Sequence, residues 1–463
     1  MKMPNHERFR WRLRITRWSE SLQVATLGFV TRAQRFHRHI VLVWRSFRTS
    51  SGRDRLRNSL YRRVPRLTQH LAGLHRRTLA RKAHLVAVVG SFGKTTATRA
   101  IKAALGIDDT RLLFGNTRTG LSASLLRIRP FARHAVLEVG IDRKGMMESY
   151  AQHLRPDIAV VTCIGSEHMT SLGSLETTRA EKAKMVAAIP SSGLVVLNGD
   201  DANVLWMRDQ SRARVVTYGF GELNDVRATD VVDDDLSGVR FNLQIDGQTY
   251  AIRTRLIGRH MIYPILAAMT VAYEEGVDLS QCIASLERLA PTHNRLQPIQ
   301  LPDSGAWILM DAYKSALETI DAALDTMSRL SASRKIVVLG DVEEPPGSQG
   351  PIYKALGSRL AEVADYVIFV GGKTNFSRLK VGTIQGGLSR DAMTNTRTDP
   401  HEIAQALNKI GLSQGDLVLI KGRSTQHLER VVLILTSHDV ACNARFCARR
   451  HDCETCPLLQ HPA

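Results

Sequence analysis

The chain has 463 residues, of which 43% are hydrophobic and 23% charged, so it can bury a sizeable core and is not intrinsically disordered. Its formal net charge is +19, but residues 1–82 contain 21 Lys and Arg against three acidic residues and account for +18 of that charge. The remainder is almost electroneutral, which argues against a protein that coats nucleic acid with its whole surface.

Residues 1–82 form an Arg-rich arm with an amphipathic helical pattern. Trp11, Ile15, Trp18 and Leu22 recur at spacings of four and three, with Arg on the other faces. Such a helix suits an anionic membrane surface. The alternatives are that it packs on the rest of the chain or pairs with a second copy, and nucleic acid is the least favoured partner.

The sequence contains no apolar window long enough to span a membrane, and its start does not read as a secretory signal. Six cysteines in this length are too few for a disulfide scaffold. These observations predict a cytoplasmic protein, with the arm able to place it at the inner face of the membrane. An organellar transit peptide is the minor alternative for the arm.

From Ala83 onward, short apolar runs alternate with helical patterns, which predicts an α/β fold with a doubly wound parallel sheet. After Pro291 a second series of such runs predicts a smaller, Rossmann-like α/β domain. The expected strands are Leu85–Val89, Ala135–Val139, Ile158–Thr162, Leu194–Leu197, Trp307–Met310, Ile336–Leu339, Tyr366–Val370 and Leu417–Ile420. The segment 219–247 reads as loops and short antiparallel strands, and 256–276 as helix-rich. The predicted domains are the arm 1–82, a central ATP-binding domain 83–294, a C-terminal domain 295–440 and a Cys-rich tail 441–463.

A glycine-containing loop directly after the first predicted strand carries the strongest chemical signal. Backbone N–H groups of such a loop, and the start of the helix that follows, point at phosphate. Lys94 would neutralise phosphate charge, and the Thr95 hydroxyl would help to hold Mg²⁺. The usual eight-residue loop needs glycine at position 88, where this chain has Val88, so the match is to a shorter variant. The predicted ATP-binding residues are Gly90, Ser91, Gly93, Lys94, Thr95 and Thr96.

This short loop resembles that of the Mur ligase family, and further motifs follow in the family's order. Glu138 lies in an apolar run, where a carboxylate is costly unless it is paired or bound to metal. It matches a family glutamate that binds Mg²⁺, and His168 matches a family histidine that also contacts a metal. The resemblance therefore implies an ATP and Mg²⁺ site.

Three more residues are assigned through the same resemblance. Lys182 matches a family lysine that reacts with CO₂ to give a carbamate able to bridge a second Mg²⁺. Lys184 is the competing candidate for that role, and the alternative for Lys182 is an ordinary solvent-exposed lysine of the helix. Arg295 matches an arginine that reaches the γ-phosphate, and Asp311 matches a contact to ATP from the C-terminal domain. After Tyr313, the chain departs from the family's asparagines, so that Lys314 becomes a possible phosphate contact.

The motifs are closest to the MurF branch of the family, although the separate N-terminal domain that binds a UDP-sugar is not expected here. The resemblance implies an ATP-dependent, ADP-forming ligase that joins an amino acid or dipeptide amine to a carboxylate acceptor through an acyl phosphate, in cell-wall or envelope synthesis. The acceptor could be lipid-linked or polymeric, as in a poly-γ-glutamate-type synthase. A P-loop kinase or NTPase that the arm recruits to membrane or RNA is the alternative from another class.

Four cysteines lie close together near the end of the sequence. Their number and spacing in a reducing compartment favour a tetrahedral Zn²⁺ site with a structural or partner-docking role. An iron–sulfur cluster and free or redox-active thiols are the alternatives. The proposed ligands are Cys442, Cys447, Cys453 and Cys456.

Overall fold

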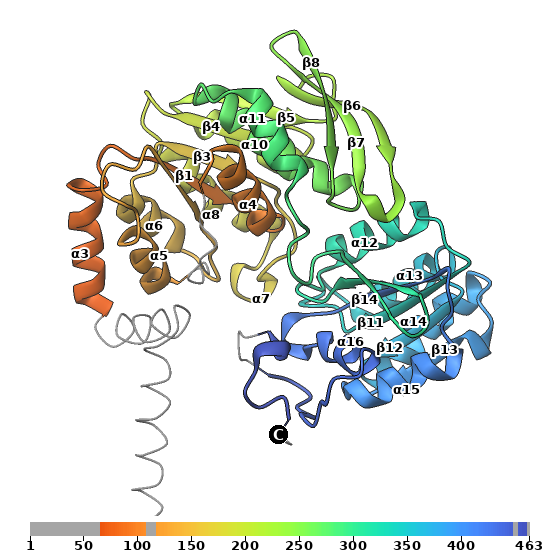
Figure 1. Cartoon of the computed structure of the whole chain (residues 1–463). Helices are drawn as coiled ribbons and strands as arrows, with labels where there is room; N and C mark the ends of the chain where they lie inside the picture. The colour runs from red at the N-terminus through yellow and green to blue at the C-terminus, as the bar shows by residue number, and fades with distance from the viewer. Residues whose placement is uncertain (1–64, 108–116, 448–451, 461–463) are drawn as a thin grey trace, which may run out of the picture. The chain divides into compact units, whose positions relative to one another are not determined.

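The structure is a computed structural model that describes residues 65–107, 117–447 and 452–460 (Figure 1). The chain divides into residues 1–74 and 75–463, and the description below concerns the second part. Most of the Arg-rich arm lies outside the described residues, so its membrane helix stays a prediction. Helix α3 (Pro65–Arg77) begins in the first part and ends in the second. No helix among the described residues combines the length and apolar character needed to cross a membrane.

The first sheet has eight strands, in the order β2-β1-β3-β4-β5-β6-β7-β8. The strands from β2 to β6 pair in parallel, whereas β6, β7 and β8 form an antiparallel meander. Their bounds are β1 (His84–Val89), β2 (His134–Glu138), β3 (Ile158–Val161), β4 (Leu194–Asn198), β5 (Arg214–Gly219), β6 (Val226–Asp233), β7 (Val239–Ile245) and β8 (Gln248–Thr254).

The central strands of this sheet are buried on both faces, which explains their continuous apolar runs. On one face Val86 and Val88 share a core with α4 (Lys94–Ala104), α10 (Ile262–Glu274) and α11 (Leu279–Glu287). The alternate β1 residues on the opposite face are also fully buried. The remaining helices of this region are α5 (Arg118–Leu125), α6 (Met146–Leu154), α7 (Met169–Leu172), α8 (Leu175–Ala187) and α9 (Ala202–Leu205).

The second sheet has six strands, in the order β13-β12-β11-β14-β10-β9, and only β9 is antiparallel. Alternate strand residues feed two hydrophobic cores, one shared with α12, α13 and α14 and the other with α15 and α16. The strands are β9 (Gln297–Gln300), β10 (Trp307–Asp311), β11 (Arg334–Gly340), β12 (Tyr366–Val370), β13 (Met393–Thr396) and β14 (Asp416–Lys421). The helices are α12 (Leu317–Arg329), α13 (Gln349–Ala361), α14 (Lys373–Gln385), α15 (Pro400–Ile410) and α16 (Glu429–Leu435).

The predicted α/β class with two mostly parallel sheets is confirmed, and each apolar run expected to be a strand is one. The segment 219–247 contains the expected antiparallel pair, although β6 and β7 are longer than predicted, at eight and seven residues, and pair along most of their length. Alternate apolar residues of β7 and of the first half of β6 face the core, but the pairing register shifts between Thr229 and Val232, where Asp230 has φ 51°. The proposed domain boundaries stay predictions.

Candidate active site

The predicted phosphate loop connects β1 to α4, and its glycines are required by the backbone. Gly90 has φ 142°, and a Cβ there would lie 2.0 Å from the Thr162 hydroxyl oxygen on the neighbouring strand's end. Gly93 has φ 77° and immediately precedes α4, so its left-handed conformation turns the chain into the helix. The loop therefore presents the N-terminus of α4 at the carboxyl end of the sheet, where α/β folds bind ligands.

Thr95, Glu138 and Arg295 meet at the start of α4, although they are far apart in the sequence. The Thr95 hydroxyl donates to Glu138 Oε2 at 2.8 Å, and an Arg295 terminal nitrogen donates to the same hydroxyl oxygen at 3.0 Å. The Arg295 guanidinium also stacks on the Tyr313 ring, 4.3 Å from its centroid. The sequence predicted roles for all three residues, and the structure brings them together.

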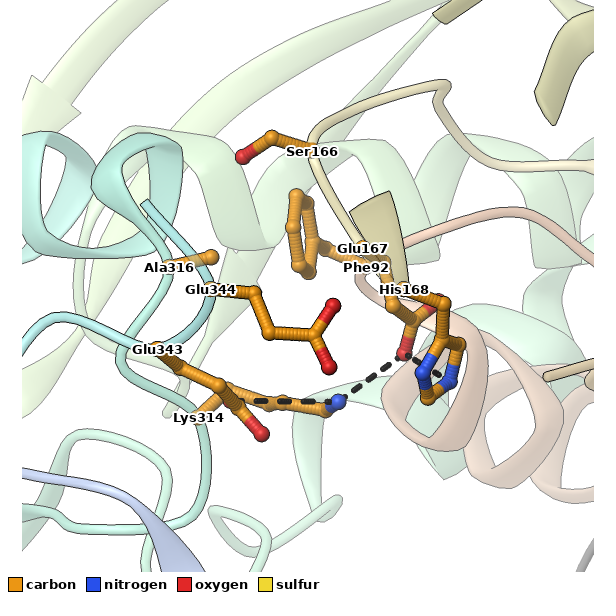
Figure 2. Close-up of a pocket in the computed structure, with 8 residues that line it drawn as sticks. All are labelled: Phe92, Ser166, Glu167, His168, Lys314, Ala316, Glu343 and Glu344. Atoms are coloured by element: carbon orange, nitrogen blue, oxygen red, sulfur yellow. Dashed lines mark ion pairs between the residues drawn. The ribbon is translucent and has the colours of Figure 1, made fainter. Parts of the chain in front are cut away.

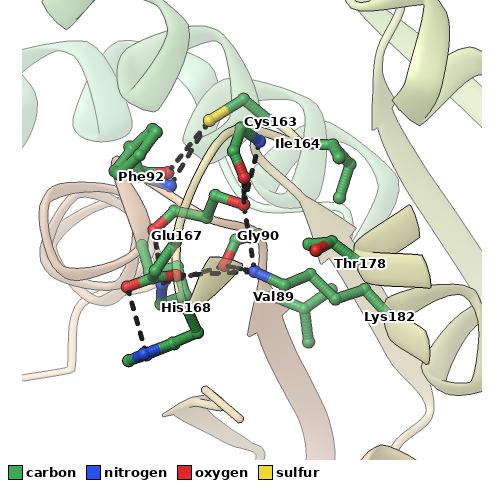
Figure 3. A network of polar contacts seen from close by, with 12 residues as sticks. Val89, Gly90, Phe92, Cys163, Ile164, Glu167, His168, Thr178 and Lys182 are labelled. Atoms are coloured by element: carbon green, nitrogen blue, oxygen red, sulfur yellow. Dashed lines mark hydrogen bonds and ion pairs between the residues drawn. The ribbon is translucent and has the colours of Figure 1, made fainter. Parts of the chain in front are cut away.

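Glu167 lies among three lysines, and these four residues are called the lysine cluster below (Figure 3 shows Glu167 with Lys182). The nearest Glu167 oxygen is 3.2 Å from Lys94 Nζ, 3.6 Å from Lys182 Nζ and 3.0 Å from Lys314 Nζ. Burial disfavours the ionised carboxylate, but the three ammonium groups outweigh burial and hold the pKa of Glu167 well below its usual range. With Lys182 protonated, the three lysines outnumber the nearby carboxylates of Glu167 and Glu343, the latter 3.9 Å from Lys314, and a surplus of positive charge remains.

Sequence reasoning missed Glu167. Its signal was its position directly before His168, in the turn that follows β3. The residue gains its importance from Lys314, which comes from the other sheet's domain and is 147 residues later in the chain. No local pattern reveals a pairing of that kind.

Lys182 points from α8 to the phosphate loop and is 1% exposed. Its Nζ donates to the Gly90 carbonyl at 2.5 Å and to the Ser91 hydroxyl at 3.2 Å (Figure 3). Burial and the neighbouring Lys94 lower the pKa of Lys182 to about 7. Lys184, the competing candidate, instead pairs with Glu181 at 2.7 Å and is much more exposed. The geometry favours Lys182 as the lysine that acts at the loop.

The two α/β regions of residues 75–463 touch at a pocket beside the lysine cluster (Figure 2). Both carboxylate oxygens of Glu318 accept from Ser166, one from its backbone N–H and one from its hydroxyl, each at 2.7 Å. Lys314 reaches Glu167 from the same side and lies 3.9 Å from Glu343. The lining residues are Phe92, Ser166, Glu167, His168, Lys314, Ala316, Glu343 and Glu344.

Two predicted site residues take other partners. His168 lies at the rim of this pocket in the left-handed region, φ 58°, with its Nε2 3.8 Å from Glu167. Asp311 pairs with the buried Lys421 at 2.8 Å, and Lys421 also donates to the Lys314 carbonyl. Asp311 therefore supports the segment that carries Lys314, and within the described residues no hydrogen bond or ion pair joins it to the phosphate loop.

The residues present fit a magnesium-bound nucleotide. The Thr95 hydroxyl and the Glu138 carboxylate are hard oxygen donors of the kind that Mg²⁺ prefers. The buried Nε of Arg295 has no hydrogen-bond partner within the described part of the chain, and a buried guanidinium nitrogen calls for an acceptor such as a phosphate oxygen. The surplus positive charge of the lysine cluster suits the same polyanion.

The four tail cysteines do not assemble into one tetrahedral group. Across the described part of the chain, the single group whose ligand atoms converge consists of Cys453 with His427 and Glu429. Cys442, Cys447 and Cys456 are free thiols outside that group. A zinc site made of the four thiols is therefore not supported by the geometry.

Comparisons with known proteins agree with this arrangement. The Mur ligase middle domain matches residues 88–272, and the Mur ligase glutamate ligase domain matches residues 294–424. The UDP-N-acetylmuramoyl-tripeptide–D-alanyl-D-alanine ligase of Bacillus subtilis is 28% identical over 355 residues, which are 75% of each chain. Two solved MurF structures share the fold. The one from Acinetobacter baumannii has a TM-score of 0.70 and 23% identity and covers 80% of each chain. The one from Thermotoga maritima in complex with ADP has a TM-score of 0.69 and 22% identity and covers 80% of this chain and 83% of that one.

The two domain matches together span most of the chain, in the same order as the two sheets of the structure. The geometry at the phosphate loop is that of a nucleotide site, and the relatives carry both domains. The chain belongs to the Mur ligase family and is an ATP-dependent, ADP-forming amide ligase, a class of enzyme that serves cell-wall synthesis.

Proposed function

We propose that the protein joins the amino group of an amino acid or dipeptide to a carboxylate acceptor through an acyl phosphate. An acceptor oxygen attacks the γ-phosphorus of ATP, and ADP leaves. The amine nitrogen then attacks the acyl carbon, phosphate leaves, and the amine loses a proton. The observation that carries the proposal is the surplus positive charge of the lysine cluster beside Thr95, Glu138 and Arg295. Positioned cations stabilise the charge that moves in phosphoryl transfer.

Within this proposal ATP binds along the phosphate loop. Lys94 and Arg295 contact phosphate oxygens, and Thr95 and Glu138, together with His168, hold Mg²⁺, which would neutralise phosphate charge there. The other loop contacts come from Gly90, Ser91, Gly93 and Thr96. Asp311 acts indirectly, because Lys421 links it to the Lys314 carbonyl.

Lys182 is proposed to form a carbamate. The reaction needs a neutral amine, because the lone pair of Nζ attacks CO₂ and one proton is released. A buried amine whose pKa is lowered to about 7 is substantially neutral near physiological pH, unlike an ordinary lysine. The anionic product would lie close to the positive charge of Lys94.

The relatives' names point to a cell-wall peptide substrate and to D-alanyl-D-alanine as the amine. We keep UDP-linked, lipid-linked and polymeric acceptors, including poly-γ-glutamate-type chains, as alternatives. A lipid-linked acceptor would suit a cytoplasmic enzyme whose Arg-rich arm contacts the inner face of the membrane. That arm should bind anionic vesicles and lose binding as salt rises, whereas equal binding to neutral vesicles would contradict the electrostatic account.

The test is release of ADP by the full chain, measured with candidate amines and acceptors and followed by mass spectrometry of the product. Wild-type protein should release ADP only when both amine and acceptor are present, and the product should gain the mass of the amine less water. Lys94→Ala should lower that rate by at least about 100-fold, because it removes a cation from the phosphate site.

Lys184→Ala is the matched control, since Lys184 is exposed and pairs only with Glu181. Its rate should stay within about twofold of wild type. ADP release that continues without any amine would favour the kinase or NTPase alternative. Undiminished turnover in Lys94→Ala would rule out the proposed chemistry.

A further inference from the structure

The Cys-rich tail folds back against α16 and the turn before it. The buried Arg430 guanidinium donates to the carbonyls of Cys442 at 3.0 Å and of Ala444 at 2.7 Å. The Cys447 backbone N–H donates to the Thr425 carbonyl at 2.9 Å. Backbone contacts to a buried arginine fix where the tail's side chains can reach, so the cysteines do not move independently of α16.

Three buried side chains meet at the start of α16 and are called the tail cluster: His427, Glu429 and Cys453. Each offers one ligand atom, and these atoms lie within 4.8 Å of one another. His427 Nδ1 is 2.7 Å from Glu429 Oε1 and 3.4 Å from Cys453 Sγ. An imidazole nitrogen, a carboxylate oxygen and a thiol are all ligand types that zinc accepts.

The other ring nitrogen of His427 fixes how the imidazole faces the cluster. His427 Nε2 lies 3.1 Å from the Cys447 carbonyl oxygen, which can only accept, so Nε2 carries the hydrogen. A carboxylate can only accept as well, so Nδ1 donates to Glu429 while no metal is bound, and a metal ion would replace that proton on Nδ1 beside Cys453. Protein histidines that bind metals typically donate their second N–H to a carbonyl or carboxylate in this way.

We propose that His427, Glu429 and Cys453 bind a zinc ion. Three protein ligands leave a fourth position, which water or Cys456 can fill, since Cys456 follows Cys453 at the common Cys-x₂-Cys spacing. The cluster is suited to a cation because a buried carboxylate, a thiol and an imidazole converge, while the guanidinium of the neighbouring Arg430 donates to the backbone carbonyls of His427, Cys442 and Ala444. The site lies in the C-terminal region and is separate from the nucleotide site.

The proposed site bears on the segment that joins the two domains. Asp452, the residue before Cys453, lies 3.3 Å from His293. His293 is two residues before Arg295, which reaches Thr95. Zinc bound at the tail cluster would therefore hold the tail against α16 and keep Asp452 beside this linking segment.

The experiment uses the full chain, stripped with a chelator and reloaded with Co²⁺ or Zn²⁺ alone. Wild type should bind one equivalent of Co²⁺ with a thiolate-to-cobalt absorption band. Cys453→Ser should lower that band by at least half, because at most Cys456 would remain as a thiolate ligand, and both Cys453→Ser and His427→Gln should bind zinc at least about tenfold more weakly. Circular dichroism and thermal unfolding of each variant verify that it is folded.

Cys442→Ser and Cys447→Ser are the matched controls, because they lie in the same tail but outside the tail cluster. Both should keep one equivalent of Co²⁺ and the absorption band. If they lose the metal as completely as Cys453→Ser, the ligands are the four thiols and the proposal fails. Absence of a stoichiometric site in wild type, or an iron–sulfur chromophore in the purified protein, would also overturn it. Neither result would touch the ligase assignment, which rests on ADP release.

Discussion

The lysine cluster and the tail cluster are both buried and polar, yet they are opposite in charge character. In the lysine cluster one carboxylate faces three lysines, so positive charge is in excess while Lys182 is protonated. In the tail cluster a carboxylate and a thiol face one imidazole, and the guanidinium of the adjoining Arg430 is directed to backbone carbonyls. Burying either set without a ligand is costly, because buried charges and lone pairs need complements.

The difference indicates what each place binds. A surplus of cations at a helix N-terminus calls for an anion such as a triphosphate. A surplus of electron-pair donors calls for a metal cation. Each cluster should therefore respond to a ligand of one sign only, and this contrast can be tested by changing single residues.

The largest effect on the rate of ADP release is expected from replacing Lys182, and Lys184 on the same helix α8 serves as the control. Lys182→Ala should lower amine-dependent ADP release by at least about 100-fold, because it removes the group that contacts Gly90 and is proposed to form the carbamate. In wild type, ¹³C-bicarbonate should give a carbamate signal by NMR that this variant lacks. Lys184→Ala should keep both the rate and the signal. If both variants lost the rate and the carbamate signal equally, the assignment of the carbamate to Lys182 would be wrong.

The second effect concerns pH. Carbamate formation requires neutral Lys182, so the rate should fall as pH decreases through about 7, where the amine becomes protonated. Glu167 raises the pKa of Lys182, and replacing it with a neutral residue should lower that pKa further. Glu167→Gln should therefore move the acidic limb of the pH–rate profile to lower pH.

The same variant should lower the maximal rate about tenfold, because Lys94 and Lys314 lose the carboxylate that orients them. A purely structural role for Glu167 would reduce the rate at every pH and leave the limb in place. A shift of the acidic limb of the pH–rate profile to higher pH would contradict the inference that Glu167 raises the pKa of Lys182.

The smallest effect is expected at the contact between the domains. Glu318→Gln retains one oxygen for Ser166 but loses the negative charge, which should lower the rate about threefold by weakening a charged hydrogen-bond pair. Asp325→Asn is the control on the same helix, because Asp325 is exposed and pairs with Arg359 away from the site. A change as large in the control would mean that the effect comes from α12 as a whole.

The sequence was sufficient to predict the parts of the molecule that depend on local pattern. The strands of both sheets follow from their apolar runs, and the phosphate loop follows from glycines that come directly after β1. The strands β5, β8, β9 and β13 were not predicted. The sequences of β8, β9 and β13 are half-exposed or short and resemble loops until neighbouring strands pair with them, whereas β5 is mostly buried and its apolar residues were overlooked.

The site was predictable where one motif fixed the residue, and was not where two distant segments share it. Lys182 and Lys184 are two positions apart on a helix and point to different faces, but only the packed structure shows which face meets the loop. Glu167 depends on Lys314 from the other domain. In the tail, cysteine spacing indicated a metal, whereas the partners of Cys453 lie 26 and 24 residues earlier in the chain.

The two hydrogen bonds between Glu318 and Ser166 have a consequence for unproductive ATP hydrolysis. Ser166 directly precedes Glu167, so the residue that holds the domains together adjoins the residue that gathers the lysines. If the two domains separate, Lys314 moves away from Glu167 together with Glu318. The domain that carries the phosphate loop then has fewer cations to stabilise phosphoryl transfer. An open enzyme with ATP bound would therefore hydrolyse it slowly. Binding of the other substrates would close the two domains and complete the site.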